Sequence, residues 1–312
     1  MPDICNGKMA GILAINGAMG IIHRFQSIED EVKEFYLAAA LVGNDGANKL
    51  PIGAAIGVTE GLERFWALRK AGCKIFCLDT ANGANIQVYQ FLLKLKDVRE
   101  GLFIIAGNVA TREQFHYLAD NDEVAPDAIR VGIAGGSVCE TRTETGIYVP
   151  TLESVIECEI ARRETDVPGI RNVPGPGYKP LIIADGGIRT PSDMCKALAC
   201  GADYVMAGRI FAGYQETPGE ILKWVGKLYK TYRGAASYGV QQEHTNEKPD
   251  FSEGDETIVP YIDKSVVKVL KRFSAGLKSS MSYANATDLQ TYRRHISVER
   301  LCQSNCQSNT AN

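Results

Sequence analysis

The loop at residues 132–139 combines residue types that can bind an anion and attack an electrophile. It reads GIAGGSVC, with three glycines, a serine and a cysteine. Glycines let backbone N–H groups approach a bound anion closely, and the hydroxyl of Ser137 can add a further donor. A cysteine beside such N–H groups is a candidate nucleophile. The alternative is a tight turn in which Cys139 packs as a small apolar side chain.

Two further loops could hold the parts of a nucleotide. Asp185-Gly186-Gly187 and Gly208-Arg209 have the form of the phosphate site that α/β barrels place after their last two strands. Asp185 suits the two hydroxyls of a ribose, or it caps a helix or turn. Asp79 and Asn108 end two other apolar runs, where they could bind the amide and ribose of a dinucleotide or be ordinary loop residues.

These residues follow short apolar runs, which are typical of buried parallel strands. The runs lie at residues 18–25, 51–58, 73–81, 102–109, 128–134, 180–187 and 204–213. Segments with helical periodicity lie between them, at residues 27–40, 60–71, 87–99, 111–119, 152–163 and 190–200. Ser27, Thr111 and Thr190 are suited to capping three of these helices. The alternation predicts a parallel α/β sheet, either doubly wound or closed as a barrel.

Chemically active residues end many different strands, which favours a (β/α)8 TIM barrel over an open sheet with one switch point. The count is one strand short, so we expect the first strand to be short or missing at the N-terminus, near residues 1–4. Residues 1–296 are then one domain. The polar segment 232–258 predicts an active-site flap after the last strand. A closing helix is expected at 266–277, and 297–312 are expected to be a mobile tail.

The composition excludes several classes of protein. The chain has 312 residues, 45% of them hydrophobic, and a net charge of −3, which disfavours a nucleic-acid binder. No run suggests a signal peptide or a membrane span, so a cytoplasmic protein is expected. The nine cysteines form no CxxC pair and the four histidines are scattered, so a zinc site is not expected.

Eight segments along nearly the whole chain resemble the IMP dehydrogenase/GMP reductase family. In order they read GIIHRF, CLDTANGA, IIAGNVATRE, VGIAGGSVCETRTETG, KPLIIADGGIRTPSDMCKAL, GADYVMAGRIFAGYQETPGE, YRGAAS and SAGLKSSMSYANATDL. The resemblance implies a (β/α)8 barrel, a homotetramer and a purine nucleoside monophosphate as substrate. It also implies that a cysteine attacks carbon 2 of the purine to give a covalent thioimidate.

The same resemblance assigns roles to individual residues. Cys139 matches the nucleophile, and Thr141 and Glu253 match residues that assist proton transfer. The substrate positions are Ser137, Asp185, Gly186, Gly187, Gly208, Arg209, Tyr232, Gly234, Ala235, Ala236 and Gly254. The positions that meet a nicotinamide cofactor are His23, Arg24, Asp79, Thr80, Ala81, Asn108 and Ile133. The backbone carbonyls of Ala134, Gly136 and Cys139 lie where family members often hold a potassium ion.

Two reactions of the family share the covalent intermediate. The dehydrogenase oxidises IMP with NAD and then hydrolyses the adduct with a flap arginine. The reductase releases ammonia from GMP and delivers hydride from NADPH, and it must keep water away. No arginine lies between Gly234 and Lys271, and 251–254 (FSEG) resembles the reductase segment. We therefore expect a GMP reductase-like enzyme with NADPH, with IMP dehydrogenase and an inactive purine-nucleotide-binding homologue as alternatives.

Three positions depart from the family pattern. Glu140 replaces a neutral residue, Arg209 replaces a small residue in the phosphate shell, and Asp250 replaces a reductase arginine. An arginine in the phosphate shell can grip the phosphate directly. These departures indicate a divergent member that could act on a deoxynucleotide or a modified purine.

Overall fold

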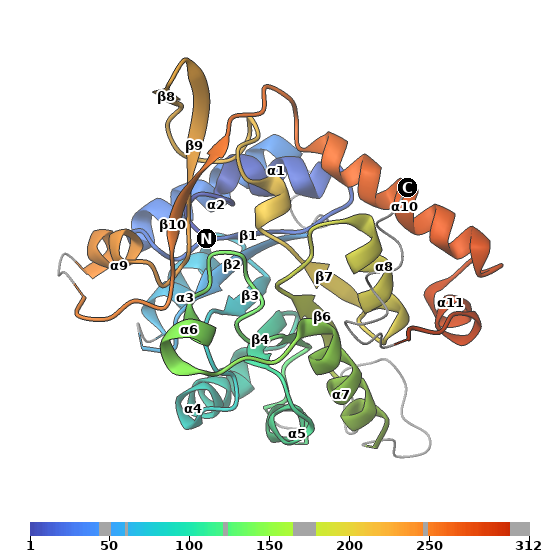
Figure 1. The fold of residues 1–312 in the computed structure, drawn as a ribbon. Helices are drawn as coiled ribbons and strands as arrows, with labels where there is room; N and C mark the ends of the chain where they lie inside the picture. Colours follow the sequence, from blue (N-terminus) through green and yellow to red (C-terminus); the bar gives the residue numbers. More distant parts are fainter. Residues whose placement is uncertain (44–50, 60–61, 121–123, 165–178, 246–248, 300–312) are drawn as a thin grey trace.

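The centre of the molecule is a curled sheet of seven parallel strands. The computed structural model describes residues 1–43, 51–59, 62–120, 124–164, 179–245 and 249–299. The strands are β1 Gly20–Ile22, β2 Ile52–Ile56, β3 Ile75–Leu78, β4 Phe103–Val109, β5 Ala128–Val131, β6 Leu181–Asp185 and β7 Tyr204–Met206. Each pairs with the next, and helices surround this half-barrel (Figure 1). The expected α/β class and all seven expected strand positions are confirmed.

Side chains alternate between the two faces of the sheet, and both faces are apolar. Phe76, Ile104 and Ile182 belong to the main core between the sheet and the helices. Their neighbours in sequence, including Cys77 and Ile105, form a separate small cluster on the concave side. Burial on both faces explains why the strands read as continuous apolar runs. The concave face becomes polar only toward the carboxyl ends of the strands.

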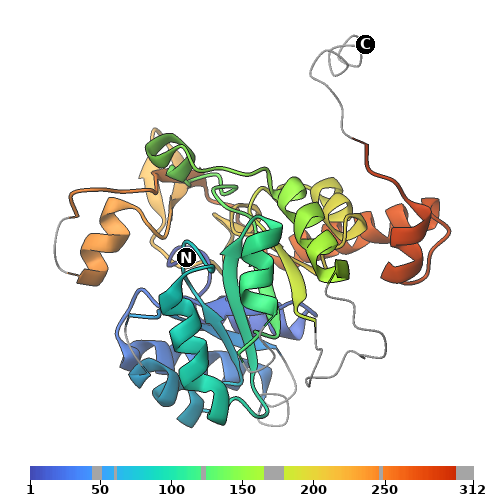
Figure 2. The same ribbon diagram turned by 90° about the horizontal axis from the view of Figure 1, so that it is seen from below.

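The outer helices follow the strands as expected (Figure 2). They are α2 Ile28–Val42, α3 Glu63–Lys70, α4 Ile86–Leu95 with the 3₁₀ turn Lys96–Val98, α5 Arg112–Ala119, α7 Thr151–Glu164 and α8 Pro191–Ala199. The hydroxyls of Ser27, Thr111 and Thr190 accept hydrogen bonds from the first turns of α2, α5 and α8. These caps satisfy backbone donors that have no partner within the helix. The three predicted caps are confirmed.

The prediction of a strand near residues 1–4 is wrong. Residues 2–4 form a turn, in which the amides of Ile4 and Cys5 donate to the carbonyl of Met1. The side chain of Asn6 then caps an unexpected helix, α1 Gly7–Ile15, whose buried face includes Met9 and Leu13. Pro2 has no N–H to donate to a sheet, and Asn6 favours a helix start. The apolar spacing of this segment is therefore helical.

The described strands do not close a circle. The seven-stranded sheet ends at β1 on one side and at β7 on the other, and no described strand joins these edges. The first strand of the expected eight is thus missing from the described part of the chain. What the structure supports is a curled parallel sheet consistent with a TIM-barrel-like fold.

The chain after β7 is more regular than expected. A 3₁₀ turn, Arg209–Phe211, precedes an antiparallel sheet of β8 Leu222–Trp224, β9 Lys227–Arg233 and β10 Glu256–Pro260. Helix α9, Tyr238–Thr245, lies between β9 and β10. The expected irregular flap at 232–258 therefore contains strand and helix, while 246–248 lie outside the described residues. Sequence periodicity missed β9 because Lys230 is buried there, donating to the carbonyls of Tyr214 and Thr217.

The closing helix is confirmed but is longer than expected, because α10 spans Val267–Tyr283. A further helix, α11 Leu289–His295, follows it and was not expected. Arg293 joins α11 to the body through the carbonyls of Leu198 and Ala202. Of the expected tail, 300–312 lie outside the described residues. No helix in the described ranges is long and apolar enough to cross a membrane.

The cap of α8 provides a test of local stability. Thr190 Oγ1 accepts from the Asp193 amide, and the Asp193 carboxylate accepts from the Thr190 amide, so two otherwise unpaired donors are satisfied. We expect Thr190→Ala to lower the free energy of unfolding by about 1 kcal/mol. Ser192→Ala, at an exposed position of the same turn, is the control. Urea unfolding of both variants checks this, and equal losses would contradict the capping role.

Candidate active site

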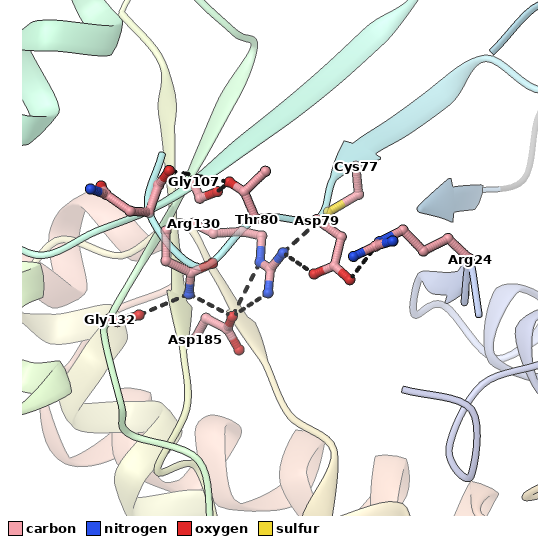
Figure 3. Close-up of polar contacts among 10 residues, drawn as sticks. Arg24, Cys77, Asp79, Thr80, Gly107, Arg130, Gly132 and Asp185 are labelled. Carbon is pink, nitrogen blue, oxygen red and sulfur yellow. Dashed lines mark hydrogen bonds and ion pairs between the residues drawn. The ribbon is translucent and has the colours of Figure 1, made fainter. Parts of the chain in front are cut away.

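The predicted site residues gather at the carboxyl ends of the strands. Asp79 directly follows β3, Asn108 lies in β4, Asp185 ends β6, and Gly208 follows β7. Because parallel strands end at the same edge, these residues from distant parts of the chain meet there. Figure 3 shows Asp79, Arg130 and Asp185 joined by polar contacts. The structure therefore builds one site from the loops that the sequence singled out.

The cysteine loop leaves β5 through Gly132, where only glycine fits. Its φ is +130°, and an added Cβ would lie 2.2 Å from the carbonyl oxygen of Asp185. Cys139 follows in a bridge with Gly254. The amide of Glu140 donates to the carbonyl of Glu253 at 2.7 Å. This strand-like pairing fixes the cysteine loop against the segment before β10.

Cys139, Thr141 and Glu253 form a continuous chain of hydrogen bonds. The thiol of Cys139 donates to Thr141 Oγ1 at 3.3 Å, and this hydroxyl donates to Glu253 Oε2 at 2.6 Å. Thr141 is the first residue of the short helix α6, Thr141–Thr145. Such a chain can carry a proton from the thiol to the carboxylate. The structure brings together the three residues that were predicted to act in catalysis.

Among the described residues, only one of the two carboxylate oxygens of Asp185 accepts hydrogen bonds. Its Oδ2 accepts from Asn108 Nδ2 at 2.9 Å and from Arg130 Nε and Nη2 at 3.1 and 2.9 Å. Its Oδ1 takes part in none of these bonds. The buried Oδ1 of neighbouring Asn108 has no hydrogen-bond partner among the described residues. A ligand bearing hydroxyl or amide donors fits this arrangement, since buried acceptors require partners.

Asp79 accepts from two arginines on either side. Arg130 Nη1 lies 3.3 Å from Asp79 Oδ1, and Arg24 Nε lies 3.4 Å from Asp79 Oδ2 (Figure 3). Burial alone would raise the pKa of Asp79, but the charges of Arg130 and Arg24 outweigh it and lower that pKa. The carboxylate is therefore ionised near neutral pH. Thr80 lies beside it and donates to the carbonyl of Gly107 at 2.6 Å.

Ser137, Tyr232 and Arg209 lie together and form the predicted phosphate end of the site. The hydroxyls of Ser137 and Tyr232 are 3.4 Å apart, and the guanidinium of Arg209 lies 5.1 Å from the centre of the Tyr232 ring. Burial raises the pKa of Tyr232, so its hydroxyl stays protonated. Gly186 and Gly187 have φ values of +91° and +75°, which favour glycine. Hydroxyl, guanidinium and loop amides are the donors that a phosphate requires.

The segment after β9 packs closely on the cysteine loop. A Cβ on Gly234 would lie 2.8 Å from the carbonyl of Val138, and one on Gly254 would lie 2.6 Å from the Ser237 amide. The carbonyl of Ala236 accepts from Ser252 Oγ at 2.8 Å, and Ala235 lies in the same turn. These small residues let the segment lie directly against the loop that carries Cys139.

Among the described residues, three other positions predicted to meet the cofactor, His23, Ala81 and Ile133, form no side-chain hydrogen bond to the residues of Figure 3. His23 is largely buried and its Nδ1 has no partner among the described residues. Burial lowers the pKa of His23 to about 3, so it is neutral. Ile133 bridges to Val149, and Ala81 is exposed. Asp250 is exposed as well, so the departure at this position lies at the surface.

The carbonyls predicted to hold a potassium ion belong to the cysteine loop, at Ala134, Gly136 and Cys139. Ala134 has a φ of +60°, and the carbonyl of Gly136 accepts from the Cys139 amide at 3.3 Å. That bond uses one lone pair of the Gly136 oxygen and leaves the other for a cation. No group of three or more His, Cys, Asp or Glu side chains in the described part of the chain could hold a metal ion.

Sequence reasoning missed Arg130, the residue at the centre of Figure 3. It is the only charged residue of β5, whose other residues are Ala128, Ile129 and Val131. Alternation places Arg130 on the concave face together with Ala128, while Ile129 points to the outer core. A lone arginine in a buried strand was the available signal, because such a charge requires partners inside the fold.

Fold and site together define a parallel α/β protein with a cysteine-centred site at the carboxyl ends of its strands. The sequence model of the IMP dehydrogenase / GMP reductase domain matches residues 1–311, and the chain belongs to this family. The resemblance predicted from the motifs is thereby confirmed at the level of the family.

The curated relatives carry one of the two family names. Inosine-5'-monophosphate dehydrogenase of Aquifex aeolicus is 37% identical over 266 residues, covering 82% of this chain and 51% of the relative. The protein of the same name from Borreliella burgdorferi is 30% identical over 355 residues, covering 96% and 84%. That from Staphylococcus haemolyticus is 30% identical over 312 residues, covering 96% and 57%. The chain spans about half the length of most of these relatives. The expectation that GMP reductases are its nearest kin is not supported.

Proposed function

We propose that this chain binds a purine nucleoside monophosphate and oxidises IMP, with NAD as the hydride acceptor. The observation that carries the proposal is the chain of hydrogen bonds from Cys139 through Thr141 to Glu253, beside a carboxylate suited to a ribose. The dehydrogenase name of the relatives favours IMP over GMP as the substrate.

The nucleotide would lie across the carboxyl ends of β5, β6 and β7. Asp185 would accept the ribose hydroxyls through its open Oδ1. The phosphate of the nucleotide would lie at the end of the site lined by Ser137, Arg209 and Tyr232. The backbone amides of Gly186, Gly187 and Gly208 would donate to it as well. The purine would then reach Cys139, with Gly234, Ala235 and Ala236 along one side. Fixing sugar and phosphate places carbon 2 next to the nucleophile, which is the main entropic contribution of such a site.

The thiol loses its proton as it attacks. Thr141 accepts the proton of Cys139 and passes its own to Glu253, while the sulfur forms a bond to carbon 2 of the purine. Bound NAD supplies the acceptor for the hydride that leaves this carbon. The thioimidate that remains on Cys139 is hydrolysed when water adds to carbon 2 and the thiolate is expelled, giving XMP. Glu253 first releases the proton of the thiol to solvent, then takes the proton of that water through Thr141 and returns it to the expelled thiolate.

The cofactor would lie on the Asp79 side of the site. Asp79 and Asn108 offer oxygens that suit its ribose and amide, with His23, Arg24, Thr80, Ala81 and Ile133 around them. The dehydrogenase name of the relatives favours NAD over NADPH. The homotetramer, the potassium ion and the closed eight-stranded barrel of the family are also proposals for this chain.

A reductase is the second candidate, and a specific observation favours it. The sequence has no arginine between Gly234 and Lys271, where the dehydrogenase is expected to carry its water-activating base. The 2.6 Å bond between Thr141 and Glu253 also suits the protonation of departing ammonia. In this reaction Cys139 adds to carbon 2 of GMP, ammonia leaves, and hydride from NADPH adds to the same carbon as the thiolate is expelled, giving IMP.

Two spectrophotometric assays distinguish these functions. The proposal predicts IMP-dependent formation of NADH, whereas the reductase predicts GMP-dependent loss of NADPH. Both assays are run side by side on ribo- and deoxynucleotides. Turnover with GMP alone would replace the proposal by the second candidate. Tight nucleotide binding without turnover in either assay would indicate an inactive binding protein.

A further inference from the structure

Arg130 contacts both Asp185, in the proposed nucleotide site, and Asp79, in the proposed cofactor site, as Figure 3 shows. It lies in the middle of the seven-stranded sheet, on β5, and its side chain is only 13% exposed. Its Nε and Nη2 donate to Asp185, while its Nη1 donates to Asp79. The guanidinium therefore joins a carboxylate of the proposed nucleotide site to a carboxylate of the proposed cofactor site.

The cluster pairs two arginines with two aspartates in largely buried surroundings. Arg130 and Arg24 carry two positive charges and Asp79 and Asp185 two negative ones, all four side chains being no more than 26% exposed. Burial would lower the pKa of Arg130, but the charges of Asp185 and Asp79 raise it above its ordinary value. Arg130 is therefore permanently charged, and any turn of its planar fork changes its bonds to both carboxylates at once.

We propose that Arg130 is a positioning residue that couples nucleotide binding to cofactor binding, so that each ligand raises the affinity for the other. The proposal rests on the proposed function, because it assigns Asp185 to the nucleotide and Asp79 to the cofactor. Ribose hydroxyls on the open Oδ1 of Asp185 hold this carboxylate in place. The plane of the guanidinium is then fixed as well, since two of its nitrogens bind the same oxygen, Oδ2.

The fixed guanidinium orients Asp79 before the cofactor arrives. The second ligand then needs less ordering of the site than the first, which makes the coupling positive. By linkage the effect is reciprocal, and each ligand lowers the dissociation constant of the other by the same factor. We expect a factor of about ten, toward the lower end of the range for coupled sites.

Calorimetric titration of the Cys139→Ala protein measures this factor without turnover. The dissociation constant of IMP is determined with and without saturating NAD, and that of NAD with and without IMP. If neither ligand binds, the proposed function has failed. If both bind and the factor is one, the coupling proposal is overturned while the proposed function stands.

The same titrations on Arg130→Lys in the Cys139→Ala background test the residue. A lysine keeps the charge but offers a single nitrogen that cannot hold both carboxylates in one plane. We expect the coupling factor to fall to about one while each separate affinity changes less than about fivefold. A merely structural role would weaken both ligands and leave the factor at ten, which would overturn the proposal.

Arg99→Lys is the matched control. Arg99 pairs with Asp127, also a partly buried arginine and a carboxylate, but this pair lies at the opposite ends of the strands. Its replacement is expected to leave the factor unchanged. If Arg130→Lys does not fold, Asp79→Asn removes one of the two bridged charges and is expected to lower the factor as well. An unchanged coupling factor in Asp79→Asn would contradict the coupling through Arg130.

Discussion

Replacing Cys139 by alanine is expected to lower turnover at least about a thousandfold while nucleotide binding is retained. The sulfur is the only group at the end of the Cys139–Thr141–Glu253 chain that can form a bond to carbon 2 of the purine. In the proposed site other residues hold phosphate and ribose, so we expect affinity to depend little on the thiol. Turnover is measured through the absorbance of the reduced nicotinamide, and binding by calorimetry.

Cys200→Ala is the control for this experiment. Like Cys139, Cys200 is partly exposed, but it caps the C-terminal end of α8, away from the site. Its variant is expected to turn over at close to the wild-type rate. Mass spectrometry of the intact protein during turnover should detect a nucleotide adduct in the wild type and in Cys200→Ala only. An active Cys139→Ala protein without an adduct would exclude the covalent mechanism, and one that still forms the adduct would show that another residue is the nucleophile.

The parallel sheet could be predicted from the sequence because burial on both faces leaves a simple pattern. Segments such as PIGAAIGV at 51–58 are apolar without alternation, and they fold as fully buried strands. The antiparallel strands β8, β9 and β10 leave no such pattern. In β9 the buried Lys230 alternates with partly exposed residues, so its position is set by tertiary contacts rather than by the strand's own composition.

The sequence marks individual residues of the candidate site, but not the contacts between them. Cys139, Asp185 and Glu253 were found from motifs, since glycine-rich loops and a resemblance mark them. The 112 residues that separate Thr141 from Glu253 carry no local signal of their contact. Arg130 was missed for a related reason, because its role depends on two carboxylates contributed by other strands. Contacts of this kind follow from the topology of the sheet, which a local pattern does not encode.

Removing the carboxylate of Glu253 is also expected to lower turnover strongly. Glu253→Gln keeps the size of the side chain but cannot take the proton that Thr141 passes on. We expect turnover to fall by about a hundredfold or more, the usual contribution of a positioned general base. Thr141→Val, which removes the hydroxyl between thiol and carboxylate, is expected to have a similar effect. Steady-state rates with saturating nucleotide and cofactor measure both changes.

The double variant Thr141→Val/Glu253→Gln tests whether Thr141 and Glu253 act in series on one proton. If the proton passes from Cys139 through Thr141 to Glu253, breaking either contact stops the same transfer, and the combined loss equals the larger single loss. Independent roles would instead multiply the two losses. Glu140→Gln is the control, because this neighbouring residue contacts Glu253 through its backbone amide only, and its rate should change by less than about threefold. A small loss of turnover in Glu253→Gln would show that another residue is the base. If the two losses multiply, Thr141 does not lie on the proton path.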